Sequence, residues 1–545
     1  MDKKTLLAIA LSFVVLVVWQ LFFAKPTPKP AGEEARTPQV EIEEVTPAPT
    51  APPVKEEIAV VEKQPTDAGG ETTVPREIVV EGPLYTATIT TAGGRIAHFT
   101  VTDYKNTIAE DSPPVDLVNE NTPILSPRVD FDTPVGSFTD DVVYTSSSED
   151  SVVITGEEKK SITLTYTGKQ FRVEKTYTFD AMEYGVGFAV VVTNLTEQNS
   201  AGDMSISLFD HIDVTKKSWS IFGSYDYPGN YLVFVDKSLK KGAAKGVKTD
   251  KPEKIPGTAT WFGFDTKYFM TALITETLTG SEVEIVRLSD SLAGGIVTMG
   301  DVSFPAGGPI EKDMTIYFGP KQVDILNQMG HSLSSAIDYG FFGFLSIPLV
   351  WLLTFFYSVF KNYGVAIILL TVVVRVVLYP FTYKSMKSMK EMQKIQPLMV
   401  ELREKYKNDK EKLNQEVMRL YQTHKINPLG GCLPLLLQLP VFIALYKALY
   451  VAIELRHSPF IFWIKDLSEM DPYYITPIVM GASYFLQQKL TPTSMDPTQQ
   501  KIMLFMPIIF TVIFLNLPAG LVLYFFVSNL LSIAQQLYMN KFVKD

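Results

Sequence analysis

The sequence predicts a multi-domain membrane protein in which a large exported β domain precedes a bundle of transmembrane helices. Of its 545 residues, 46% are hydrophobic and 20% are charged. This is too apolar for an ordinary soluble protein and too charged for a membrane bundle alone. The two kinds of residue are also separated along the chain. Apolar runs fill most of residues 341–545, whereas residues 76–325 alternate polar and apolar positions as soluble β-strands do.

The N-terminal segment, residues 1–24, is predicted to be a transmembrane signal anchor. An apolar run from Leu6 to Ala24 follows Lys3 and Lys4, and its length is close to the minimum for a span. A cleaved signal peptide is the alternative, but the run ends without the small-x-small pattern of a cleavage site. We therefore expect the segment to remain attached to the exported domain.

Residues 25–75 are predicted to form a disordered tether. The segment holds ten prolines, and its ten acidic residues outnumber five lysines and arginines. Such a composition cannot bury enough apolar surface to offset the entropy of ordering the chain. A spacer is favoured over a binding segment.

Residues 76–325 are predicted to form one antiparallel β super-sandwich. The stretches YTATITTAGGRIAHFTVTDY and SITLTYTGKQFRVEKTYTF alternate apolar and polar residues with a period of two, and Asn, Asp and Gly clusters separate such runs. About 250 residues of short strands suit a large sandwich. Some aromatic residues could line a ligand cleft, although core packing is the favoured interpretation: Trp219, Tyr225, Tyr227, Tyr231 and Trp261.

A charged block, residues 384–425, interrupts the apolar C-terminal runs and fixes their orientation. It carries eleven lysines and arginines against six acidic residues, so the positive-inside rule places it in the cytoplasm. Its apolar stripes predict a helical hairpin that turns at Asn408 and Asp409. A merely solvated hairpin and a docking surface for an acidic partner are equally compatible with this pattern.

The spans follow from this orientation. Phe341–Phe360 and Tyr363–Phe381 cannot both cross the bilayer, because only Lys361 and Asn362 join them and the charged block would then end outside. Residues 341–362 are therefore predicted to form an amphipathic helix at the outer interface. Residues 363–545 are predicted to hold five spans, with the β domain outside and both termini in the cytoplasm.

A single arginine, Arg375, lies inside one of these spans. A charged side chain at such depth costs roughly 2.5–3.5 kcal/mol on insertion scales, and none of the other four predicted spans contains Asp or Glu. They do contain uncharged polar residues, and Thr371 lies one turn before Arg375. We interpret the set as lining a wet cavity, and snorkelling of Arg375 to the inner surface is the alternative.

The sequence offers little support for enzyme chemistry. It has one cysteine and five scattered histidines, and it lacks the phosphate-binding GxxxxGK[ST], the dinucleotide-binding GxGxxG and the nucleophile GxSxG patterns. No basic domain stands apart from the spans, so a direct role with nucleic acid is not expected. We expect a protein that is not an enzyme and that needs neither metal nor cofactor.

Three motifs resemble the YidC/Oxa/Alb family of membrane protein insertases: INPLGGCLPLLLQLPVFIALYKAL, TVVVR and LPAGLVLYFFVSNLLSIAQQ. The resemblance extends over the whole layout of anchor, exported domain and five-span core. It implies a bacterial inner-membrane protein with a periplasmic β domain. It also implies a hydrophilic groove in the core that is open to the cytoplasm and to lipid but closed to the outside.

The resemblance also implies site residues and partners. The groove arginine and glutamine of the family fall on Arg375 and Gln438, and its substrate-contacting positions fall on Thr371, Tyr524 and Phe525. Many relatives have a second tyrosine where this chain has Phe525, so a hydroxyl is lost there. The implied partners are newly made membrane proteins and the lipid bilayer, with the Sec translocon and the ribosome as further candidates. Because the chain ends soon after the last span, ribosome contact would rest on the hairpin and loops.

The favoured hypothesis is an insertase and chaperone that moves client segments through the groove without nucleotide hydrolysis. A solute or ion transporter that uses Arg375 as an anion site is the alternative, although the five spans show no internal repeat of the kind transporters carry. A membrane-anchored scaffold whose β domain is the working part is a third reading.

Overall fold

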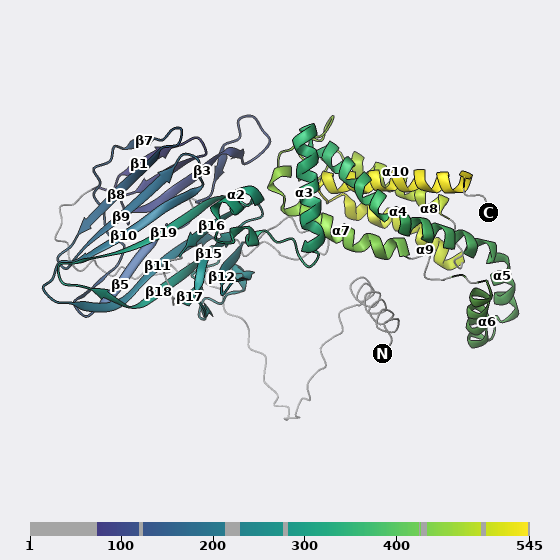
Figure 1. Ribbon diagram of the computed structural model, residues 1–545, viewed down its shortest axis with the longest axis horizontal. Coiled ribbons are helices and arrows are strands. Elements are labelled where there is room, and N and C mark those ends of the chain that lie inside the picture. Colours follow the sequence, from purple (N-terminus) through teal and green to yellow (C-terminus); the bar gives the residue numbers. More distant parts are fainter. Residues whose placement is uncertain are drawn as a thin grey trace, which may run out of the picture. The chain divides into compact units, whose positions relative to one another are not determined.

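The computed structural model describes residues 74–118, 122, 124–212, 229–275, 282–424, 426, 433–491 and 497–542. The predicted signal anchor and nearly all of the predicted tether lie outside these residues. Within them, a β domain comes first along the chain and a group of helices follows (Figure 1).

The β domain contains three sheets built from antiparallel neighbours, with one parallel pair between β1 and β7. Their orders are β4-β3-β2-β1-β7, β13-β12-β15-β16-β19-β10-β9-β8 and β14-β17-β18-β11-β5-β6. The strands are β1 Glu77–Glu81, β2 Tyr85–Thr90, β3 Arg95–Lys105, β4 Pro114–Asp116, β5 Arg128–Thr133, β6 Gly136–Phe138, β7 Ser151–Val153, β8 Lys159–Thr167, β9 Phe171–Asp180, β10 Gly185–Asn194, β11 Ser200–His211, β12 Asn230–Val235, β13 Ser238–Ala243, β14 Glu253–Ile255, β15 Ala259–Asp265, β16 Phe269–Ile274, β17 Glu282–Arg287, β18 Leu292–Phe304 and β19 Pro309–Pro320.

The two smaller sheets cover the same face of the eight-stranded sheet. Phe171 and Phe179 lie an even number of residues apart on β9, so their side chains point to one face. Phe171 packs edge-on against Phe131 of β5 at 4.9 Å between ring centroids. Phe179 lies 6.3 Å from Tyr85 of β2. The domain is therefore a two-layer sandwich, which confirms the antiparallel β architecture predicted from the alternating pattern.

One charged residue breaks the apolar inner face of β9. Lys175 is fully buried, and its Nζ donates hydrogen bonds to Asp140 Oδ2 at 2.5 Å and to the carbonyl of Gly93 at 2.7 Å. Asp140 is also fully buried, and it accepts further hydrogen bonds from Tyr144 Oη and the amide of Val129. A buried charge pair is tolerated only when its remaining polar atoms are satisfied, as they are here.

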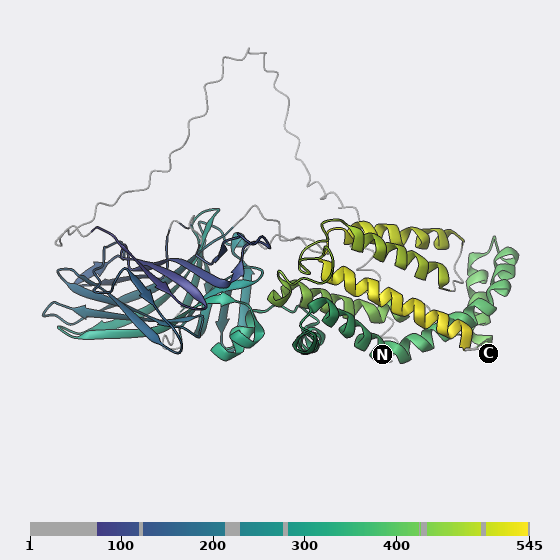
Figure 2. The same ribbon diagram turned by 90° about the horizontal axis from the view of Figure 1, so that it is seen from above.

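Helices make up the described part of the chain after β19. They are α2 Val323–Met329, α3 Gly343–Phe360, α4 Tyr363–Lys394, α5 Gln396–Lys405, α6 Lys410–Thr423, α7 Leu433–Val451, α8 Ile475–Leu490, α9 Pro497–Phe514 and α10 Ala519–Phe542, with 3-10 turns at Leu333–Ala336 and Ile453–Leu455. A further 3-10 turn, Ala244–Gly246, lies in the β domain between β13 and β14. Figure 2 shows α10, in yellow, running along the middle of the group, where it contacts α4, α7 and α8.

Three of the described helices are long and apolar enough to cross a membrane, namely α3, α4 and α10. Shorter apolar stretches occupy Leu437–Val451 in α7 and Phe505–Phe514 in α9. Length and composition thus admit α3 as a span, although the sequence predicts an interfacial helix there. In Figure 1, α3 runs across α4 and not alongside it. This direction is compatible with a helix that lies along the outer membrane–water interface while α4 crosses the bilayer. The number of crossings remains a prediction.

The charged block differs from the predicted hairpin in one respect. Helix α4 continues to Lys394, so the first residues of the block extend this helix beyond the predicted span. The hairpin itself consists of α5 and α6, and Asp409 caps α6 by accepting a hydrogen bond from the amide of Lys412 at 3.0 Å. The predicted turn at Asn408 and Asp409 is confirmed.

A glycine allows α8 and α9 to pack closely. A Cβ placed on Gly481 would lie 1.9 Å from Thr511 Oγ1, and this hydroxyl is held in place by its hydrogen bond to the carbonyl of Pro507. Gly481→Ala is therefore expected to lower the stability of the full-length protein by about 1–3 kcal/mol, the usual cost of overpacking. Thermal unfolding in detergent would measure this, with Ala482→Val at the exposed neighbouring position as the control. Equal stability of the two variants would contradict the close packing.

Candidate functional site

Arg375 lies on α4 and faces α10. Its guanidinium donates hydrogen bonds from Nε, at 2.9 Å, and from Nη2 to the same acceptor, Ser528 Oγ. Ser528 is 1% exposed. No carboxylate lies within ion-pair distance of Arg375 among the described residues. The positive charge is thus held by a neutral hydroxyl and stays uncompensated.

A second pair of polar groups lies one helical turn away on α10. Tyr524 precedes Ser528 by four residues, so the two share one face of the helix. The Nε2 atom of Gln438, on α7, donates a hydrogen bond to Tyr524 Oη at 2.8 Å. Helix α10 therefore presents two neighbouring hydroxyls, one bound to α4 and one bound to α7. These four side chains, Arg375, Ser528, Tyr524 and Gln438, are called the polar site below.

Two of the residues expected at the site have other partners. The hydroxyl of Thr371 is fully buried and donates to the carbonyl of Ile367 in its own helix, at 2.6 Å. The ring of Phe525 packs edge-on against Phe514 at 4.7 Å and Phe442 at 5.1 Å. Neither offers a free polar group, so any contact they make with a client would be one of shape and apolar surface.

Ser528 was not singled out from the sequence, although it lies in the LPAGLVLYFFVSNLLSIAQQ motif. The available signal was its spacing of four residues from Tyr524, which places it on the same helix face. The sequence shows several serines and amides in this span. Only the packing of α4 against α10 reveals which hydroxyl meets Arg375.

Most other polar residues of the bundle bind neighbouring helices. Asn529 donates to Ser483 Oγ at 3.3 Å, Gln535 donates to Thr382 Oγ1 at 3.0 Å, and Gln536 donates to the carbonyl of Leu490. Such hydrogen bonds between helices hold a bundle together. These polar residues therefore serve as contacts between helices, and the wet cavity around Arg375 stays a prediction.

Removal of the Ser528 hydroxyl should weaken the bundle. Ser528→Ala leaves the guanidinium without its neutral acceptor, and we expect a loss of about 1–2 kcal/mol, the range for a hydrogen bond between membrane helices. Thermal unfolding of the full-length protein in detergent would measure it. Ser358→Ala is the matched control, because the exposed Ser358 hydroxyl bonds only to Phe355 of its own helix. An effect of Ser528→Ala no larger than that of the control would remove Ser528 as the partner of Arg375.

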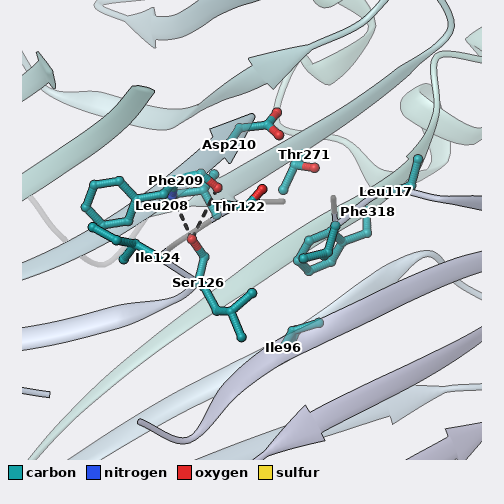
Figure 3. Close-up of a pocket in the computed structure, with 12 residues that line it drawn as sticks. Ile96, Leu117, Thr122, Ile124, Ser126, Leu208, Phe209, Asp210, Thr271 and Phe318 are labelled. Carbon is teal, nitrogen blue, oxygen red and sulfur yellow. Dashed lines mark hydrogen bonds between the residues drawn. The ribbon is translucent and has the colours of Figure 1, made fainter. Parts of the chain in front are cut away.

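The β domain offers no comparable site in the small cavity drawn in Figure 3. Its volume is about 10 Å³, room for about one water molecule. Figure 3 shows Ser126 Oγ beside the backbone of Phe209, whose amide donates to it at 2.7 Å. Of the aromatic residues considered for a cleft, Trp261 and Tyr231 are buried in the core as favoured. Trp219, Tyr225 and Tyr227 lie outside the described residues.

Two family models match the chain. One, described as 60Kd inner membrane protein, matches residues 355–545, and the other, described as YidC periplasmic domain, matches residues 77–352. A protein named membrane protein insertase YidC from Syntrophus aciditrophicus is 40% identical over 99% of this chain and 100% of its own length. Its namesake from Geotalea daltonii is 38% identical, with 99% of both chains covered.

A solved structure was also found. It is described as an active YidC insertase with the first transmembrane domain resolved, and the match covers 85% of this chain and 92% of that one, at 18% identity and a TM-score of 0.37.

Proposed function

Because the chain belongs to the YidC family of membrane protein insertases, we propose that its helices insert client segments through the polar site of Arg375, Ser528, Tyr524 and Gln438. The protein is an inner-membrane insertase with a periplasmic domain, and its clients are membrane proteins. Insertion makes and breaks no covalent bond, so the chain is not an enzyme in the ordinary sense.

The observation that carries the proposal is the uncompensated charge of Arg375. A hydroxyl holds the guanidinium in place without neutralising it. The guanidinium can therefore attract a carboxylate or a carbonyl oxygen of a client. In a region of low dielectric constant, this attraction is stronger than it would be in water.

The proposed step lowers the cost of moving polar groups through hydrocarbon. A peptide group without a hydrogen-bond partner is expensive to transfer into lipid. Polar side chains part-way into the bilayer would bind a short hydrophilic segment of the client. They would thereby shorten the distance that this segment must travel through hydrocarbon. The client's own apolar span would then leave past Thr371, Tyr524 and Phe525 into lipid and supply the driving force.

The membrane potential adds to this force, at about 2.3 kcal/mol per charge per 100 mV. With the outside positive, it favours outward movement of acidic residues. No nucleotide is required in this scheme.

The orientation of the chain follows from its charges. The hairpin of α5 and α6, together with both termini, is proposed to face the cytoplasm, and α3 is proposed to lie along the outer interface. The hairpin would be the surface through which a ribosome or the Sec translocon makes contact, since it exposes basic side chains such as Lys405 and Arg419. The transporter alternative is not favoured, because relatives that match over the full length are named insertases.

Reconstitution tests the proposal. The purified full-length chain is placed in sealed liposomes without nucleotide, and a one-span client with an acidic tail is added. Protease protection of the tail is compared with that in empty liposomes. Protection above the empty control that falls in Arg375→Ala supports insertion through the polar site. Protection unchanged by the substitution would remove Arg375 from the route, and no protection at all would indicate a required partner or solute transport.

A further inference from the structure

The loop between α7 and α8 is fixed to the outer ends of two predicted spans. Phe460 packs on α4 so closely that a Cβ on Gly364 would lie 1.9 Å from its ring, and its carbonyl accepts a hydrogen bond from Asn362, the N-cap of α4, at 3.3 Å. At the start of α10, the amide of Gly520 donates to the carbonyl of Leu467 at 2.9 Å. The loop is therefore held at the depth where these two helices begin.

The same loop directs a large apolar side chain away from the protein. Phe462 is 85% exposed, the most exposed aromatic residue of this loop, and its neighbour Ile461 is 48% exposed. Phe462 also has a φ of 55°, in the left-handed region that bulky residues rarely adopt. Such a conformation costs of order 1–3 kcal/mol. Phe462 belongs to neither of the buried apolar clusters of the described residues, so core packing does not offset this cost.

The turn that holds Phe462 outward is well defined. The amide of Phe460 donates to the carbonyl of Ile464 at 3.0 Å, which closes a tight turn over Phe462. Trp463 stacks on Phe462 at 5.9 Å between centroids, and its indole Nε1 donates to Asp471 at 3.1 Å. Asp471 is fully buried and also accepts hydrogen bonds from Thr476. The exposed tip is thus rigidly supported, which is not expected of a chance excursion of a loose loop.

We propose that Ile461 and Phe462 form a wedge that enters the outer leaflet of the bilayer beside α4. The occupant that fits is lipid, because the turn is fixed at the start of a predicted span, where the hydrocarbon region begins. Trp463 packs its ring against Phe462 and donates its indole N–H to a carboxylate. Such a half-apolar, half-polar environment is typical of tryptophans at the membrane–water interface. Two further aromatic residues of the same loop, Tyr473 and Tyr474, are 66% and 41% exposed.

The wedge would keep the outer end of α4 at a fixed depth in the bilayer. It depends on α4 and α10 crossing the bilayer, and not on the polar site acting as the route of insertion. Its failure would therefore leave the proposed function untouched.

Site-directed spin labelling of the full-length protein in liposomes tests the wedge. The chain has one cysteine, Cys432, so Cys432→Ser provides a background in which Phe462→Cys carries the only label. Lys465→Cys, three residues further in the same loop and also exposed, is the matched control. We expect the ratio of oxygen to nickel-chelate accessibility to be several-fold higher at position 462 than at 465. Size-exclusion profiles matching the parent chain confirm that both variants are folded.

Two results would overturn the proposal. Equal access of the nickel chelate to both positions would place Phe462 in water. Shielding of position 462 from oxygen and chelate alike would mean that protein, and not lipid, covers the wedge.

Discussion

Arg375→Glu is expected to reduce the insertion of clients with acidic tails by at least about tenfold, because it turns an attraction into a repulsion of the same range. The substitution should disturb the bundle little. In the parent chain the Ser528 hydroxyl accepts hydrogen bonds from the guanidinium; in the variant the same hydroxyl can donate one to the glutamate carboxylate. The change therefore acts mainly on the charge presented to the client. Protease protection in liposomes measures it.

A pair of clients makes this prediction specific. The two should differ only in the exported tail, which carries Asp and Glu in one and Asn and Gln in the other. Arg375→Glu should affect the acidic client far more than its uncharged partner. Arg375→Lys, which keeps the charge but loses the planar double contact with Ser528, should retain most of the activity. Equal losses for both clients would show that Arg375 acts by holding the helices together.

Asp140→Ala is expected to destabilise the β domain by about 3–5 kcal/mol, the usual cost of leaving one member of a buried ion pair without its partner. Lys175 would remain in the core with only the carbonyl of Gly93 as an acceptor. Tyr144 and the amide of Val129 would also lose the carboxylate that they bind. Denaturant unfolding of the full-length protein, followed by tryptophan fluorescence with Trp261 kept and the other four tryptophans replaced by Phe, would report this loss.

The neighbouring residue supplies the control for this effect. Asp141 also pairs with arginines, but its side chain is 61% exposed, so Asp141→Ala should cost less than about 1 kcal/mol. The double substitution of Asp140→Leu with Lys175→Met removes both charges and should recover much of the stability, because an apolar pair can replace a buried ion pair. A single variant Asp140→Ala as stable as Asp141→Ala would show that the pair contributes little.

The family and the kind of fold could be predicted from the sequence because both depend on local pattern. Alternation along β9 places every second residue on one face, and the apolar run Tyr363–Phe381, which contains Arg375, is long enough to span a bilayer whatever surrounds it. Basic residues in the block that contains α5 and α6 predict its side of the membrane for the same reason. Even the burial of Lys175 is consistent with this pattern, since it shares the inward positions of Phe171 and Phe179.

The tertiary structure decided which residues meet. Ser528 became the partner of Arg375 only through the packing of α10 against α4, and nothing local distinguishes it from Ser532 one turn later. Thr371, which has the right spacing, instead binds its own helix, since a threonine hydroxyl in a helix can reach the carbonyl four residues earlier. The outward course of Phe462 likewise follows from the contact of Phe460 with Gly364.

The sequence by itself determined the elements, the charge that needs a partner and the family, because these depend on neighbours along the chain. Partners distant along the chain were decided by the packing of helices and sheets, because each depends on a contact between surfaces that no single segment encodes.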